Sequence, residues 1–201
     1  MRRRQRELAI ALLATTLGCG AATTVPTADI TSGDDVALTT RAPRRLSADQ
    51  LARSLEVATG QPWIQFEAHA DTLGRPDYLH TLTEGEQISV AFLRFAEDGA
   101  RATCSAAVAA ERELSDPAQR PILGAVALDQ PDPAARRVNL RRLVLRFLGL
   151  SITSDDDPRL ATLLPLLESP IAGRQGRAPM EALRWTAVCV ALATRLDFLT
   201  Y

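Results

Sequence analysis

Several segments of the chain carry apolar residues at three- and four-residue spacing, between residues that begin or end helices. In the clearest one, Ser47 and Gln50 have the spacing of a capping box, and Gly60 follows as a helix stop. The segment 132–149 opens in a similar way, with Asp132 directly before a proline. A half-buried strand would instead alternate apolar and polar residues. The sequence therefore predicts a mostly α-helical fold.

About six helices are expected, packed as a single bundle-like domain with irregular connecting segments. The predicted ranges are 47–60, 83–99, 100–114, 132–149, 158–168 and 179–192. In the last range, Trp185 and Cys189 widen the apolar stripe, which predicts a helix at the centre of the bundle. Residues 61–83 lose the helical period, so their aromatic side chains are expected to fill the core or form a short strand. Residues 122–128 fit either a helix or a strand.

The first residues have the features of an export signal. Arginines occupy positions 2, 3, 4 and 6, and an apolar run follows over 8–17. As a helix this run would be roughly 15 Å long, about half the thickness of a hydrocarbon core. It is therefore too short to span a bilayer, and a signal-peptide hydrophobic region fits it better.

The apolar run ends in Leu-Gly-Cys19, which resembles the bacterial lipobox, in which the cysteine receives lipid. Thr16 stands where lipoproteins usually have leucine. The resemblance implies a signal peptide over 1–18 and a mature chain that begins at Cys19. An ordinary secretory signal cut after position 20 or 22 is one alternative. A twin-arginine signal is another, although only its arginine pair is present.

Composition separates a tether from a folded domain. Residues 19–44 are rich in Thr, Ala, Asp and Pro without an apolar period, which is typical of a flexible tether, and 45–201 form the predicted helical domain. All the basic residues are arginines. Without the four arginines and one glutamate that precede Cys19, 19 arginines face 23 acidic residues. This mildly acidic balance argues against nucleic acid as a partner.

The three cysteines of the chain have two kinds of expected role. If Cys19 carries lipid, Cys104 and Cys189 remain as an even pair in an oxidising compartment, where a disulfide can form. Both also suit the buried faces of helices as free thiols. The spacing alone leaves the two alternatives open, because it does not show whether the Cα atoms approach within ~7 Å.

One cluster of residues resembles a metal or acid–base site: Glu67, His69, Asp71 and His80. The first three would share one face if their segment were extended. The two histidines lack a recognised ligand spacing, so solvated loop residues are the competing interpretation. No cofactor is indicated by any motif.

The helix predicted at 132–149 carries arginines on the face opposite its apolar stripe. They are Arg136, Arg137, Arg141, Arg142 and Arg146. Such a set can bind phosphate or an acidic partner, or it can simply be a solvated face. The three aspartates at 155–157 precede a proline and suit a helix N-terminus.

Three short stretches occur in an order that is similar to a known type of domain. They are Arg45-Leu-Ser-Ala-Asp-Gln-Leu, Leu73-Gly-Arg-Pro and Trp185-Thr-Ala-Val-Cys-Val-Ala-Leu followed by Asp197-Phe-Leu. They resemble the helical C-terminal domain, of unknown function, of large planctomycete-type secreted proteins, where it accompanies cytochrome-c-like modules. The chain lacks the Cys-x-Cys-Glu-Arg stretch of those domains and any Cys-x-x-Cys-His haem attachment site. The resemblance implies an exported helical domain, and it supplies no active residue.

These observations favour a non-enzymatic protein that is anchored by lipid in a bacterial cell envelope and binds or scaffolds another exported protein. It would face the periplasm or lie at the cell surface, and Gly20 after the lipid site favours the outer membrane over the inner. The rival hypothesis is a metal-dependent or redox-associated accessory enzyme that uses residues 67–80. The sequence contains no Gly-x-Ser-x-Gly motif of a serine hydrolase.

Overall fold

The computed structural model describes residues 43–80, 82–169 and 176–201, so the predicted signal peptide, Cys19 and most of the predicted tether lie outside the described residues. The elements in chain order are α1 (Ala48–Thr59), α2 (Phe66–His69), α3 (Val90–Glu111), the 3₁₀ turn η1 (Pro117–Gln119), α4 (Pro133–Leu148), α5 (Pro158–Glu168), α6 (Arg177–Ala193) and α7 (Leu196–Leu199). Across the described residues there is no strand, only an isolated bridge between Arg45 and Thr200. The predicted mostly α-helical class is confirmed.

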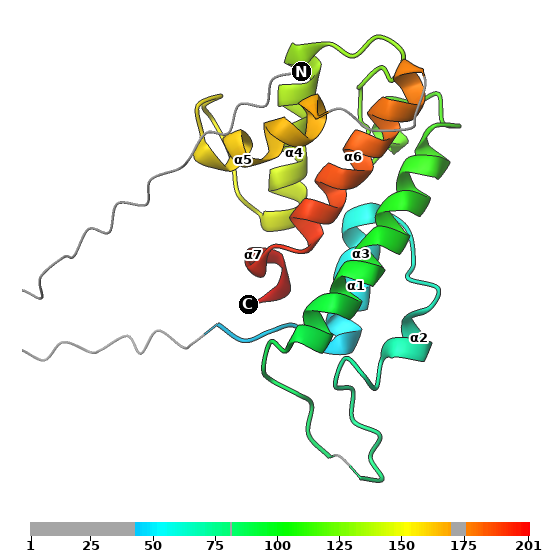
Figure 1. Ribbon diagram of the computed structural model, residues 1–201, viewed down its shortest axis with the longest axis vertical. Helices are drawn as coiled ribbons and strands as arrows, with labels where there is room; N and C mark the ends of the chain where they lie inside the picture. Colours follow the sequence, from blue (N-terminus) through cyan, green and yellow to red (C-terminus); the bar gives the residue numbers. More distant parts are fainter. Residues whose placement is uncertain (1–42, 81, 170–175) are drawn as a thin grey trace, which may run out of the picture. The chain divides into compact units, whose positions relative to one another are not determined.

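The longest helices, α3 and α6, lie side by side and form the centre of the domain (Figure 1). Helix α1 packs against α3, whereas α4 and α5 pack against α6. Trp185 of α6 is completely buried, as the broad apolar stripe of this helix predicted. None of the helices in the described ranges is both long enough and apolar enough to cross a membrane.

Helix α1 has the ends that its sequence predicted. The Ser47 side chain accepts a hydrogen bond from the backbone N–H of Gln50, and the Gln50 side chain accepts one from the N–H of Ser47. Gly60 ends the helix in the left-handed region, with φ +73°. The predicted capping box and glycine stop are therefore confirmed.

Helix α3 differs from the prediction, which divided it into two helices at Gly99. The predicted start at residue 83 is wrong, and Glu86 lies before the helix, where it pairs with Arg44 at 2.8 Å. The helix begins instead after Ser89, whose hydroxyl accepts a hydrogen bond from a backbone N–H in the first turn. It then continues through Gly99 without a break.

Gly99 lies inside the helix because it makes room for an aromatic ring. A Cβ atom at this position would lie 2.7 Å from Cε3 of Trp63. Trp63 is buried and fills the core, as one of the two sequence interpretations had it, whereas the neighbouring Ile64 is exposed. The turn of helix α2 directly after them was not predicted.

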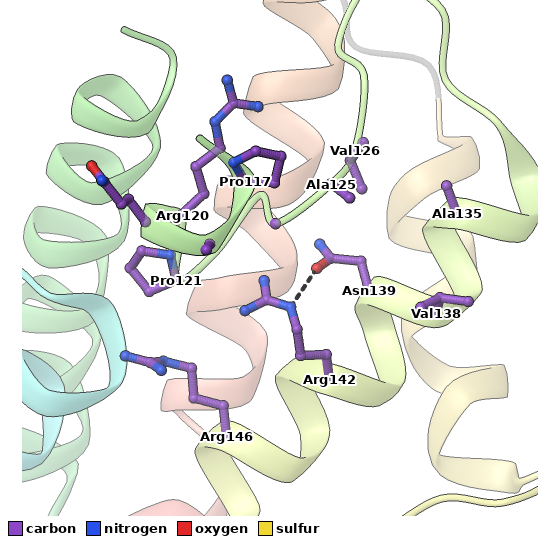
Figure 2. A pocket seen from close by; sticks show the side chains of 13 residues that line it. Pro117, Arg120, Pro121, Ala125, Val126, Ala135, Val138, Asn139, Arg142 and Arg146 are labelled. Atoms are coloured by element: carbon purple, nitrogen blue, oxygen red, sulfur yellow. Dashed lines mark hydrogen bonds between the residues drawn. The ribbon is translucent and has the colours of Figure 1, made fainter. Parts of the chain in front are cut away.

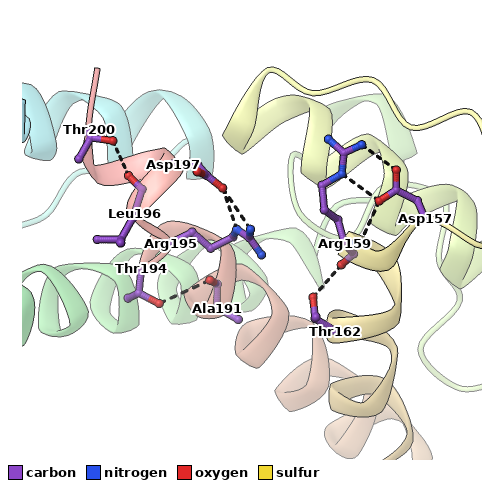
Figure 3. A network of polar contacts seen from close by, with 9 residues as sticks. All are labelled: Asp157, Arg159, Thr162, Ala191, Thr194, Arg195, Leu196, Asp197 and Thr200. Atoms are coloured by element: carbon purple, nitrogen blue, oxygen red, sulfur yellow. Dashed lines mark hydrogen bonds and ion pairs between the residues drawn. The ribbon is translucent and has the colours of Figure 1, made fainter. Parts of the chain in front are cut away.

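Aspartate side chains cap the N-terminal ends of α4 and α5. Asp132 accepts hydrogen bonds from two backbone N–H groups at the start of α4, as predicted. Asp157 caps α5 and is held by the guanidinium of Arg159 (Figure 3). Near the end of the chain Arg195 holds Asp197 in a similar way.

The last residues return to the core after α6. Phe198 and Leu199 are buried, whereas Tyr201 is exposed. Its backbone pairs with Arg44, since Arg44 N–H donates to Tyr201 O at 3.1 Å and Tyr201 N–H donates to Arg44 O at 2.9 Å. Tyr201 therefore contributes to the fold through its backbone.

Candidate functional site

The four residues proposed as metal ligands do not come together. The segment forms the helical turn α2 rather than an extended strand, so Glu67 and His69 do not share one face, and Asp71 lies beyond the helix. Among residues 43–80, 82–169 and 176–201, no three His, Cys, Asp or Glu side chains are grouped closely enough to hold a metal ion. The acid–base cluster read from the sequence is therefore not assembled in this part of the chain.

Each member of that set has another contact. The His69 ring lies between Phe95 and Trp63, at centroid distances of 4.8 and 5.8 Å. Glu67 accepts a hydrogen bond from Arg75 at 2.7 Å, and this bond holds the pKa of Glu67 below its ordinary value. His80 is exposed and donates its backbone N–H to an aspartate side chain.

The guanidinium of Arg75 lies close to several of these carboxylates. Besides Glu67, its guanidinium lies 3.9 Å from Asp71 and 3.8 Å from Asp49. Its carbon atom Cζ also lies 5.6 Å from the ring centroid of Phe66. The acidic side chains of this region are therefore neutralised by an arginine of the chain itself.

Cys104 on α3 and Cys189 on α6 form a disulfide, with their Cα atoms 5.9 Å apart. Both residues are completely buried where the two central helices meet. The bond joins the two longest helices. Of the two roles that the sequence left open for these cysteines, the structure shows the disulfide.

A pocket with a volume of about 620 Å³ lies between α4 and the segment 117–126 (Figure 2). The basic residues that line it are Arg120, Arg142 and Arg146. None of the described residues that line it is acidic. Prolines, alanines and valines form most of the remaining wall, together with Gln119, Gly124 and Asn139, and Val138 is 58% exposed. The pocket is thus cationic and partly apolar.

The position of Arg142 is fixed by a polar network. Its Nε donates to Oδ1 of Asn139 at 2.9 Å, and its Nη2 donates to the Ile122 carbonyl at 3.0 Å. The Asn139 amide donates to the same carbonyl at 2.9 Å. Gly124, at φ +53°, allows this approach, because a Cβ there would lie 2.8 Å from Asn139 Oδ1. The second terminal nitrogen of Arg142, Nη1, has no hydrogen-bond partner among the described residues.

A buried carboxylate also holds the backbone segment to which this network is bonded. Glu111, which is 2% exposed, accepts hydrogen bonds from the backbone N–H groups of Ile122 and Leu123. Burial raises the pKa of Glu111, and these hydrogen bonds together with the positive charge of Arg142 oppose that rise. Glu111 therefore holds the pocket wall in place, and it does not line the pocket.

Arg146 connects the pocket to the end of α1. Its Nε and Nη2 donate to the carbonyls of Ala58 and Val57, at 2.6 and 2.8 Å. These carbonyls belong to the last turn of a helix, where they lack intrahelical partners and attract positive charge. Arg142 lies nearby, and burial, followed by the charge of Arg146, lowers its pKa.

Arg120 is the arginine of the pocket with the least satisfied side chain. Its Nη2 donates to the Leu114 carbonyl. Its Nε is shielded from solvent and has no hydrogen-bond partner in the described part of the chain. Buried donors are almost always paired, so this unpaired nitrogen sets Arg120 apart from the other two arginines of the pocket.

The structure divides the arginine set that the sequence singled out on α4. Arg136 forms an ion pair with the buried Glu181, and Arg141 pairs with Asp155 at 2.6 Å, so both have structural partners. Arg137 lies exposed, away from the pocket. Only Arg142 and Arg146 line the pocket, and Arg120, from a proline-bounded segment, was not singled out by any sequence pattern.

Comparisons of the chain with protein-family models, curated proteins and solved structures give no match.

Proposed function

We propose that the protein is an exported, lipid-anchored binding protein that receives an acidic, partly apolar segment of another exported protein in the arginine pocket. The observation that carries the proposal is the convergence of Arg120, Arg142 and Arg146 on one pocket with no acidic residue in its described lining. A binding role fits this arrangement better than catalysis, since no nucleophile or acid–base pair lies among the lining residues described.

The chemistry of the pocket selects the partner. Guanidinium groups form strong, directional hydrogen bonds with carboxylates. Arginine is also enriched at protein interfaces, where exposed apolar residues are covered by the partner. Val138 and the prolines of the 117–121 segment supply that apolar surface. An acidic stretch that also carries small or apolar side chains would match both parts.

The anchoring part of the proposal depends on Cys19 and its lipobox-like setting. It predicts a mature protein that begins at this cysteine and carries fatty acid. An intact mass spectrum of the purified protein would measure the first residue, the acyl groups and the two hydrogens lost to the disulfide together. A chain that still begins at Met1, or one cut beyond position 19 without fatty acid, would contradict the anchor.

Site-specific photo-crosslinking of the full-length protein in its membrane tests the pocket. A photoreactive amino acid in place of Val138, at the pocket rim, should crosslink an acidic segment of one exported protein. The same amino acid in place of Arg137, exposed on the other side of α4, is the matched control and should not.

A charge reversal makes the test specific. Arg120→Glu should abolish the crosslink from position 138, because it places a carboxylate beside the partner's own, whereas Arg137→Glu should leave it intact. Equal effects of the two reversals, or a crosslinked peptide without acidic residues, would refute the assignment. If the partner belongs to a redox complex, as the resemblance to cytochrome-associated domains implies, haem absorbance should accompany the crosslinked product.

A further inference from the structure

A second arginine site lies directly before α1, where the guanidinium of Arg45 is buried without an ion-pair partner in the described residues. Arg45 is 6% exposed. The only hydrogen bond that its side chain forms within the described residues runs from Nη1 to the Leu46 carbonyl, at a long 3.3 Å. Its Nε is shielded from solvent and has no partner there. A buried charge without a partner is costly, so it calls for an anion.

The acidic side chains nearby are occupied elsewhere. Glu84 accepts a hydrogen bond from the backbone N–H of Ala48 at 2.7 Å, and Glu86 pairs with Arg44. Glu84 acts on Arg45 only through its field, which raises the pKa of the guanidinium, while burial has the larger effect and lowers it. The protein itself therefore compensates this charge incompletely.

The surroundings of the guanidinium form a cavity of about 470 Å³. The Phe92 ring lies beneath the charge, with its centroid 4.4 Å from Arg45 Cζ. Gly74 and Gly85 lie against Nη2, since a Cβ on either would be 2.7 Å from this nitrogen. Three neutral polar residues also line the cavity: Thr72, Gln87 and Ser89. The volume is in the range of small-ligand sites.

We propose that this cavity binds the carboxylate of a small organic acid, with Arg45 as its charge partner and Phe92 as the apolar floor. Thr72, Gln87 and Ser89 can hydrogen-bond the remainder of the ligand. Glu86 also lines the cavity, and its negative charge disfavours phosphate and other multiply charged anions. The site shares no residue with the arginine pocket, so it does not depend on the proposed binding of a protein segment.

The test uses the full-length protein in detergent, with propionate and phenylacetate as probes. Isothermal titration calorimetry should detect saturable binding of at least one probe, and the same probe should raise the unfolding temperature. Phosphate at equal ionic strength should do neither. Arg45→Met should weaken binding by about tenfold to a hundredfold, which corresponds to the loss of a charge-assisted hydrogen bond. Arg137→Met, on an exposed residue, is the control.

A second variant guards against loss of folding. Gly85→Ala places a methyl group 2.7 Å from Arg45 Nη2 and should displace the flexible guanidinium, so it too should weaken binding. Without a probe, Arg45→Met should be at least as stable as the wild type, because it removes an unpaired buried charge.

Three results would overturn the proposal. One is the absence of carboxylate binding by the wild type, and another is equal binding by wild type and both variants. The third is phosphate binding as tight as that of the carboxylates. Marked destabilisation by Arg45→Met together with no carboxylate effect would assign Arg45 to a purely structural contact with Phe92.

Discussion

At the residue scale, the buried charged side chains differ in how many hydrogen-bond and ion-pair partners they have. Those with several partners connect parts of the fold. Glu181 illustrates this, since it is 1% exposed and receives Arg136 and the Trp185 indole N–H, the latter at 3.1 Å. Its hydrogen bond raises the pKa of Arg136. Arg45 and Arg120 are the opposite case, and each has a shielded Nε without a partner in the described ranges. Arg136 therefore holds two helices together, whereas the Nε of Arg45 and the Nε of Arg120 contribute no hydrogen bond there.

Replacing Glu111 with alanine should destabilise the protein by about 1–3 kcal/mol. The reason is that the backbone N–H groups of Ile122 and Leu123 would lose their acceptor while remaining buried. Urea denaturation followed by circular dichroism would measure the difference. Glu113→Ala, on an exposed residue two positions later, should change little. Equal stability of Glu111→Ala and the wild type would show that the carboxylate does not support the pocket wall.

The Asp157 cap should make stability depend on acid pH. A hydrogen bond from the Arg159 side chain, followed by one from its backbone N–H, lowers the pKa of Asp157 from 3.8 to about 2. Because the folded pKa is the lower one, the carboxylate stabilises the fold above pH ~4, and this contribution is lost as the pH falls toward ~2. Asp157→Asn should lose this part of the pH dependence in denaturation curves, whereas Asp156→Asn should retain it.

At the element scale, α3 depends on one glycine that is neither a cap nor a stop. Gly99→Ala gains helix propensity of up to about 1 kcal/mol, but it overpacks Trp63, which should cost about 1–3 kcal/mol. We expect net destabilisation in thermal or urea unfolding. In a Trp63→Leu background the same change should instead be neutral or stabilising. Destabilisation of equal size in both backgrounds would mean that the ring does not set the requirement.

The same helix shows why sequence patterns predict some elements and not others. The caps of α1 and α4 are local, since Ser47 and Asp132 act on N–H groups two or three residues away, and both were predicted. Glycine is needed at position 99 because the ring of Trp63, 36 positions earlier in the chain, packs against it, and no local sequence pattern contains this contact. The division of α3 into two helices failed for this reason.

The pocket was only half visible in the sequence for a related reason. The arginines of α4 form a periodic set, but which of them are free depends on distant acids such as Glu181 and Asp155. Arg120 lies just before residues 122–128, which the sequence left undecided between helix and strand, and the structure forms turns at 121–125. The histidine cluster failed because its segment folds as a helical turn and Arg75 neutralises its carboxylates.

At the scale of the whole molecule, the disulfide closes a long loop between the two central helices. The sequence separation of Cys104 and Cys189 is 85 residues. A chain-entropy treatment of such a loop gives a stabilisation of about 4.5 kcal/mol. Replacing both cysteines with alanine, or reducing the bond, should therefore lower the free energy of unfolding by about 2–5 kcal/mol. Denaturant titration with and without reductant would measure it, and the double variant should not respond to reductant.

The pairing of Arg44 with Tyr201 determines how the domain would respond to a force applied through residue 43. Tension arriving at residue 43 reaches first the two backbone hydrogen bonds between Arg44 and Tyr201, then the bond from Leu46 N–H to Leu199 O. The first two bonds join the same residue pair and the third lies two residues further along, so the Arg44–Tyr201 pair would be loaded first. The paired segments at 44–46 and 199–201 would therefore separate before the force reaches the helices.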